Sequence, residues 1–189
     1  MKAKIIIFAL LSIFGFLLAT LGLISFPVFH NVNYFWPAAV VQAVGSILFG
    51  WTGIIAGTVF PIFANYTTDK SLMSLFCYTP SNFIQSFLPY YLYTKRINPQ
   101  LNISNFKGAI LFAVCAGVIP QLCGGILAGG VLSLIGQIGT WEAFLKLVFL
   151  WFIDSVPWIV IFGIPILIIF VPLLKDSGYL FSLEINNEP

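Results

Sequence analysis

The sequence predicts an all-α integral membrane protein, a compact bundle of six membrane helices whose second and third segments are short and glycine-rich. The composition predicts the class, because 60% of the residues are hydrophobic and only 7% are charged. A soluble domain carries about a quarter charged residues to cover its surface. The chain divides into six apolar segments, at about 5–28, 35–49, 51–65, 72–94, 107–135 and 143–174. No stretch is polar enough to form a separate soluble domain, so we expect residues 1–189 to form one transmembrane domain.

The first segment, 5–28, reads as a retained membrane helix rather than a cleaved signal peptide. It is longer than the usual apolar region of about 7–15 residues, and no clear small-x-small cleavage site follows it. Its Gly15-x-x-x-Ala19 spacing suits a close approach between helices. That face packs either inside the bundle or against a partner subunit, and the sequence leaves both open.

The second and third segments, 35–49 and 51–65, meet at Gly50 and are shorter than the roughly 20 residues that a membrane crossing needs. They form either two short, tilted spans or a broken pair that turns back within the protein. Irregular backbone at membrane depth requires burial in protein or a cavity beside it. Gly53-x-x-x-Gly57 again suits a close helix contact.

Polar side chains fall at membrane depth in the fourth and fifth segments. Asn82 and Gln85 are three residues apart and therefore share a helix face. Gln121 follows Pro120, so it lies beside a helix break. These amides either line one pocket or form hydrogen bonds between helices, and the sequence does not separate the two.

The last segment, 143–174, holds the most informative residue, Asp154. A charge at membrane depth costs about 2.5–3.5 kcal/mol on insertion scales, so an acid there is functional by default. The segment would extend about 48 Å as a helix, and we expect its prolines to interrupt it. They are Pro157, Pro165 and Pro172. An acid beside a proline break predicts a polar pocket.

Two tryptophans, Trp151 and Trp158, flank the acid on the same segment and are suited to stacking on a planar ligand. The alternative is that Asp154 is a structural tie, paired with Lys146 two turns earlier or with the backbone of another helix. Most other aromatic residues gather near the predicted outer side, as in an interfacial belt.

The basic residues predict the orientation. Six of the eight lysines and arginines fall on one side of the predicted bundle, namely Lys2, Lys4, Lys95, Arg96, Lys107 and Lys175. Lys70 lies in an outer loop, as does the single histidine, His30. By the positive-inside rule, we expect a multi-pass protein of the cell membrane with both termini in the cytoplasm.

Motifs for catalysis, nucleic-acid binding and metal binding are missing. The sequence has no HExxH, GxSxG or Walker motif and no basic block suited to nucleic acid. Its cysteines, Cys77, Cys115 and Cys123, show no CxxC spacing and read as small buried hydrophobes. We therefore expect no enzyme, catalytic residue, cofactor or metal site.

Two family resemblances follow from these motifs. The sequences YFWPAA at 34–39 and LFGWTGIIAG at 48–57, followed by Asn65, resemble the early helices of the substrate-capture subunits (S components) of energy-coupling factor vitamin transporters. Asn82, the Trp151-x-x-Asp154 motif and Pro165-Ile166-Leu167 resemble the membrane-associated sensor domains of bacterial diguanylate cyclases and histidine kinases.

The expected function is substrate capture, because the sequence ends at Pro189, shortly after the last segment, where a sensor would continue into a signalling domain. The resemblance implies a vitamin-like ligand, a membrane coupling subunit and ATPases as partners. Gly15 and Ala19 would dock the coupling subunit. The expected ligand-binding residues are Asp154, Trp151, Trp158, Asn82, Gln85 and Gln121. The alternative is a membrane sensor domain that signals through a partner protein.

Overall fold

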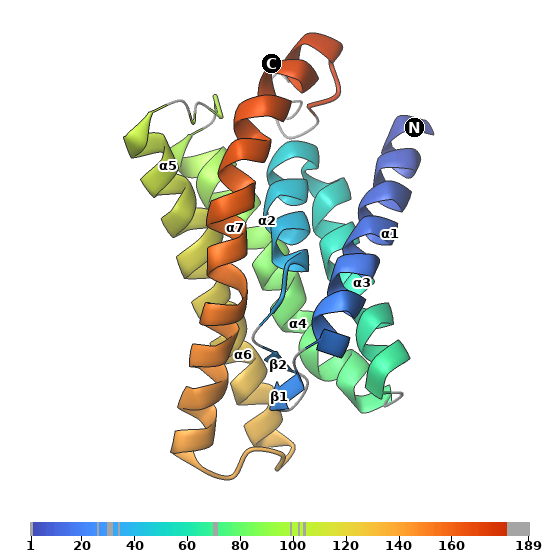
Figure 1. Cartoon of the computed structure of the whole chain (residues 1–189), viewed down its shortest axis with the longest axis vertical. Helices are drawn as coiled ribbons and strands as arrows, with labels where there is room; N and C mark the ends of the chain where they lie inside the picture. Colours follow the sequence, from blue (N-terminus) through green and yellow to red (C-terminus); the bar gives the residue numbers. More distant parts are fainter. Residues whose placement is uncertain are drawn as a thin grey trace.

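The computed structural model describes residues 2–25, 27–29, 32–33, 35–69, 72–98, 100–101, 103 and 105–180. Over these residues the protein is a bundle of helices with one short two-stranded ladder (Figure 1). In chain order the elements are α1 (Lys2–Ser25), β1 (Pro27–Phe29), β2 (Val32–Asn33), α2 (Ala38–Phe49), α3 (Trp51–Asp69), α4 (Leu72–Leu88), η1 (Pro89–Ile97), α5 (Phe106–Phe112), η2 (Ala113–Val118), α6 (Ile119–Leu134) and α7 (Trp141–Ser177). His30, Tyr34 and Lys70 lie outside the described residues.

The described helices form six continuous rods. The π-helical stretch η1 extends α4, and η2 joins α5 to α6, so these five elements make only two rods. The rods fall on the six predicted segments, with ends that differ by about one helical turn at most. Three of them are long and apolar enough to cross a membrane, namely α1, the α5–η2–α6 rod and α7. The chain is therefore all-helical in class, with three candidate membrane-spanning helices.

The ladder between α1 and α2 was not expected from the sequence. Its strands pair antiparallel, with Pro27 opposite Asn33 and Phe29 opposite Val32. Strands of two and three residues are too short to show an alternating hydrophobic pattern. Figure 1 shows the chain rising from this ladder to the start of α2, which begins in the middle of the bundle.

Helix α2 lies at the centre of the bundle. Every residue from Ala38 to Leu48 is buried, and α1, α3, α4 and α7 all pack against the helix. Its 12 residues rise only about 18 Å. That is less than the roughly 30 Å of a bilayer core. Helix α2 is therefore enclosed by protein rather than crossing a membrane by itself.

Glycine is required where α2 turns into α3. Gly50 has a φ of 56°, a conformation that L side chains rarely adopt. A Cβ at Gly53 would lie 2.0 Å from the carbonyl oxygen of Gly45. The two helices therefore meet backbone to backbone, and this contact holds the start of α3 against the buried helix.

Helix α7 runs unbroken through its three prolines, so the expected interruption is wrong. It spans 37 residues, or about 55 Å, and Thr140 caps its start by accepting a hydrogen bond from the Ala143 amide at 3.2 Å. All three prolines have exposed side chains on the outside of the bundle. Each removes one backbone donor, and the remaining bonds keep the helix continuous.

The distribution of polarity is the reverse of that in a soluble protein. Long apolar side chains of α1 and α7 point outward, and Leu10 and Ile161 are about 60% exposed (61% and 62%). The glutamines Gln42, Gln85 and Gln121 are fully buried. An apolar exterior around a polar interior suits a protein whose solvent is lipid.

Candidate functional site

A group of buried polar side chains occupies the middle of the bundle, and we call it the polar cluster. Its members are each no more than 3% exposed and come from α2, α4 and α6. They are Gln42, Ser81, Asn82, Gln85, Ser86 and Gln121. Polar side chains buried among apolar helices are costly unless they are hydrogen-bonded, so their partners decide what the cluster is for.

Helix α4 supplies most of the cluster. Ser81, Asn82, Gln85 and Ser86 occur at positions i, i+1, i+4 and i+5, which places them on one side of the helix. This side faces the interior because α4 packs between α3 and α6. The opposite side carries apolar residues such as Phe83, which is 38% exposed.

A chain of hydrogen bonds joins α2 to this side of α4. The Trp36 indole donates to Gln42 Oε1 at 3.3 Å. Gln42 Nε2 in turn donates to Asn82 Oδ1 at 3.2 Å and to the Gly57 carbonyl at 3.0 Å. The Gln42 amide therefore has its donor and acceptor engaged, and it ties α2 to both α3 and α4.

The second amide pair of the cluster is only half satisfied. Gln85 Nε2 donates to Gln121 Oε1 at 2.5 Å. Among the described residues, no hydrogen-bond partner lies near Gln85 Oε1 or Gln121 Nε2, nor near the hydroxyls of Ser81 and Ser86. These four atoms include an acceptor, a donor and two groups that act as either. They offer a complementary set of contacts to a small polar molecule.

Glycines let the helices approach closely enough to form the cluster. A Cβ at Gly57 would lie 2.4 Å from Ser86 Oγ, and a Cβ at Gly124 would lie 2.8 Å from Gln85 Cγ. The backbones of α3 and α6 therefore press directly on the polar side of α4.

Asp154 and Trp151 border the cluster from α7. Trp36 donates its backbone amide to the Asp154 carbonyl at 3.1 Å, which connects α7 to the chain of hydrogen bonds through Gln42. Asp154 is 5% exposed, and its carboxylate accepts a hydrogen bond from Ser155 Oγ. The Trp151 ring lies 5.7 Å from that of Tyr78, and its Cβ is 3.2 Å from the Cβ position of Gly125.

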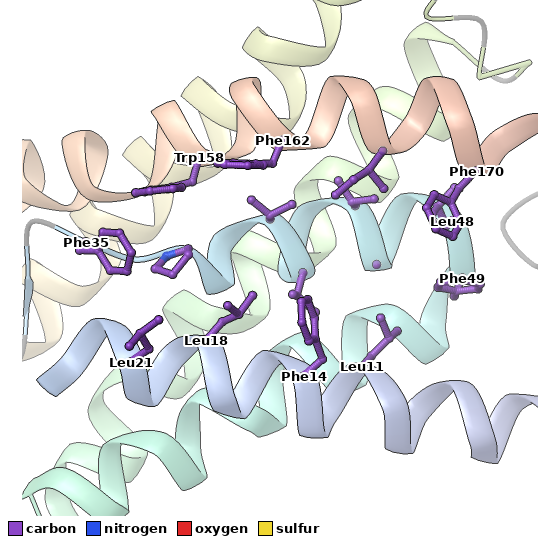
Figure 2. Close-up of a pocket in the computed structure, with 16 residues that line it drawn as sticks. Leu11, Phe14, Leu18, Leu21, Phe35, Leu48, Phe49, Trp158, Phe162 and Phe170 are labelled. Atoms are coloured by element: carbon purple, nitrogen blue, oxygen red, sulfur yellow. The ribbon is translucent and has the colours of Figure 1, made fainter. Parts of the chain in front are cut away.

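Trp158 lies apart from the other predicted site residues. Its ring meets Phe35 edge to face at 4.6 Å and stacks on Phe162 at 5.5 Å. It lines an apolar groove on the outside of the bundle, between α1 and α7 (Figure 2). The structure thus brings Asn82, Gln85 and Gln121 together, places Trp151 and Asp154 at their border, and separates Trp158 from them.

Gly15 and Ala19 lie inside the bundle. A Cβ at Gly15 would be 2.4 Å from the Phe60 ring of α3, and Ala19 is fully buried in the same contact. Of the two alternatives that the sequence leaves open, the structure shows the contact within the chain. In this arrangement neither residue is exposed to a partner subunit.

Sequence reasoning left four contributors out of the predicted site. The sequence does mark Gln42 as a candidate, since it is an amide in an otherwise apolar segment. Trp36 joins the site only because the extended chain before α2 reaches the middle of the bundle. Ser81 and Ser86 are harder to single out from the sequence, because small hydroxyl residues are common in membrane helices.

The described residues contain no group of three or more His, Cys, Asp or Glu side chains that could hold a metal ion. The chemistry that the site offers is hydrogen bonding from neutral amides and hydroxyls, with one carboxylate at its border. Comparison with protein-family models, with curated proteins and with solved structures finds no match to this chain.

Proposed function

We propose that this protein is a membrane-embedded binding subunit for a small, vitamin-like molecule, which it passes to a separate, ATP-driven coupling module for uptake. The observation that carries the binding half of this proposal is the set of four unpaired polar atoms in the polar cluster. Leaving a buried donor or acceptor unpaired costs about 1–3 kcal/mol. A bound molecule that pairs these atoms would recover that energy, so the cluster is suited to a ligand with its own donors and acceptors.

Each predicted site residue has a place in this proposal. Gln85 and Gln121 would bind the ligand directly through their free amide atoms, with Asn82 fixed beside them by Gln42. Trp151 would form an apolar wall, and Asp154 would engage a donor group at the border. Trp158 is not part of this site because it lies in the external groove.

The location that we propose is a cell membrane, with six membrane segments and both termini in the cytoplasm. Three helices have the required length and hydropathy. Figure 1 shows the N-terminus, the start of α5 and the C-terminal end of α7 at the same end of the bundle. Lys2, Lys107 and Lys175 lie on these elements. Their shared end is the one that the positive-inside rule assigns to the cytoplasm.

The test of binding is native mass spectrometry of the full-length protein, purified in mild detergent from the cells that express it. We expect an added mass of small-molecule size on the wild type. The Gln85→Met and Gln121→Met variants should lose it, because methionine keeps the length of glutamine without its polar atoms. The control is Thr20→Val, which removes another buried, unpaired hydroxyl, on α1 and outside the cluster.

The outcomes separate the alternatives. Retention of the molecule by both amide variants would remove the polar cluster from the binding site, and a wild type that carries no such molecule would contradict the proposal. The coupling half is tested by mild cross-linking before purification. Co-isolation of ATPase subunits supports uptake, whereas co-isolation of a kinase or cyclase would instead favour the sensor alternative.

A further inference from the structure

The π-helical stretches η1 and η2 are a feature that the proposed function does not use. Their backbone hydrogen bonds join residues five apart instead of four. In η1 the Asn98 amide donates to the Tyr93 carbonyl at 2.7 Å, and at the end of η2 the Ile119 amide donates to the Val114 carbonyl. The two stretches belong to different rods but contact each other. Turns of this kind are rare and occur frequently at functional sites.

Both stretches lie next to the polar cluster. Gln85 is four residues before η1 begins, and Gln121 is three residues after η2 ends. Figure 1 shows α5, which joins the two stretches, at the end of the bundle where both chain termini lie. On η1, Thr94 is 1% exposed, and its hydroxyl has no partner among the described residues. Unpaired polar atoms therefore continue from the polar cluster toward that end.

The connections of the two stretches to α4 and α6 are suited to bending. Pro89 is the first residue of η1, and Pro120 follows η2 at the start of α6. Each proline removes one backbone donor at its junction, and kinks in helices form at prolines and at π-helical turns. Each π-helical stretch also holds an extra residue. Moving that residue along the helix shifts its neighbours by about 1.5 Å and turns them by about 100°.

The elements η1, α5 and η2 form one unit, which we call the hairpin tip. Helices α4 and α6, which carry most of the polar cluster, pack against each other and form the base of the hairpin. The prolines and π-helical turns lie between the tip and this base. The tip can therefore move while Gln85 and Gln121 keep their positions.

Tyr93 holds the two sides of the hairpin tip together. It is fully buried, and its ring meets Phe112 edge to face at 5.5 Å. Its hydroxyl donates to the Gly108 carbonyl of α5 at 3.5 Å and accepts from Asn98 Nδ2 at 3.0 Å. The bond to Gly108 is long and therefore weak.

The hairpin tip is held against α2 and α7 by apolar contacts and by a strained residue. Leu101 is 2% exposed and has a φ of 54°, which is unfavourable for a branched side chain. Strain of this kind persists only where the surroundings impose it, and it is common in switch regions. Phe112 packs on α7, where a Cβ at Gly163 would lie 2.7 Å from its ring. Release of these contacts would also release the strain at Leu101.

We propose that η1 and η2 are the hinges of a gate, and that the hairpin tip moves away from α2 and α7 to release the bound molecule at the end of the bundle that carries both termini. In the proposed orientation this end faces the cytoplasm. The identity of the released molecule rests on the proposed function, whereas the movement rests on the geometry of the hairpin.

Native cysteines report the movement. Cys115 on η2 and Cys77 on α4 are both 6% exposed. Cys115 packs in the same apolar cluster as Tyr93, whereas Cys77 packs in a separate one with Trp151. The exposed Cys123 is replaced by serine. The reaction of each buried thiol with N-ethylmaleimide, followed by mass spectrometry of the full-length protein in mild detergent, measures how often its surroundings open.

The test variant is Tyr93→Phe, which keeps the ring and removes the hydroxyl. We expect Cys115 to react about threefold faster, the effect of losing one average hydrogen bond between membrane helices, while the rate at Cys77 stays the same. The matched control is Tyr91→Phe, also on η1. The Tyr91 hydroxyl accepts from Arg96 Nε and Nη2 at 3.0 and 2.6 Å, within the same stretch. Its removal should change neither rate.

Release is measured on the same variants by native mass spectrometry during repeated buffer exchange. The small molecule carried by the wild type should be lost from Tyr93→Phe about threefold faster and from Tyr91→Phe at the wild-type rate. An unchanged Cys115 rate in Tyr93→Phe would overturn the gate, as would a parallel rise at Cys77, which indicates general loosening.

Faster labelling of Cys115 with an unchanged rate of release would also overturn the gate, because the movement would then not control the bound molecule. A wild type that carries no small molecule contradicts the proposed function, and the labelling rates alone then decide whether the hairpin tip moves. Failure of the gate and failure of the proposed function are therefore distinguishable.

Discussion

The hydrogen bond between Gln85 and Gln121 leads to a prediction about stability. In the Gln85→Met variant, Gln121 Oε1 loses its donor while Gln121 Nε2 remains unpaired, so one buried amide has no partner at all. We choose methionine because Gln85 Cγ lies 2.8 Å from the Cβ position of Gly124, which leaves no room for a branched side chain.

The expected magnitudes follow from this geometry. Each single substitution removes this hydrogen bond, and the remaining amide then has two unpaired buried atoms, the same number as in the wild-type pair. Hydrogen bonds between membrane helices average about 0.6 kcal/mol and reach about 1.7, so we expect each single substitution to lower the free energy of unfolding by about 1 kcal/mol. The double substitution removes both amides, including the two atoms that were already unpaired, and should be nearly neutral or stabilising. The coupling energy is then about 2 kcal/mol or more.

The assay is unfolding in mixed micelles by titration with sodium dodecyl sulfate, followed by tryptophan fluorescence. The Gln85→Met and Thr20→Val pair provides the control cycle, because Thr20 Oγ1 has no hydrogen-bond partner among the described residues. The effects of these two substitutions should therefore add. Additivity within about 0.3 kcal/mol in the Gln85 and Gln121 cycle would refute a direct bond between the two amides.

Three further predictions follow from other contacts. Gly53→Ala should destabilise the protein by about 1–3 kcal/mol, because the added Cβ would meet the Gly45 backbone. The control, Gly130→Ala, should be neutral in the same titration. Equal effects of the two substitutions would contradict the close contact at Gly53. Asp154→Asn should keep the wild-type circular dichroism spectrum but weaken retention of the small molecule, and unchanged retention would remove the carboxylate from the site. In a cysteine-free background, Gly139→Cys should react with a membrane-impermeant maleimide on intact cells. Gln100→Cys should react only after the cells are permeabilised, and the reverse pattern would invert the proposed orientation.

The helices were predictable because each apolar segment is bounded by polar or turn-forming residues. Burial of the amides was also predictable, since Asn82, Gln85 and Gln121 stand out in an apolar chain. Their pairing was not predictable, because it depends on which helices are neighbours. The glycines at 57 and 124 determine that approach, and their partners are far apart in sequence.

The two tryptophans of α7 show a second limit. Trp151 and Trp158 are seven residues apart and lie on nearly the same side of the helix. Their neighbours differ because α7 is long enough to pass from one packing partner to another. Trp151 meets Tyr78 of α4, whereas Trp158 meets Phe35 before α2. A pattern along one helix cannot show this change of neighbours.

The shortness of α2 has a consequence for how the protein is made. A helix of 12 residues does not partition into a bilayer as an independent span during synthesis. In the membrane location that we propose, α2 would enter together with α3 and would reach its buried position only when α4 and α7 are there to enclose it. Assembly around α2 would then be a late step, and defects in its contacts would leave an inserted chain open to quality-control proteolysis.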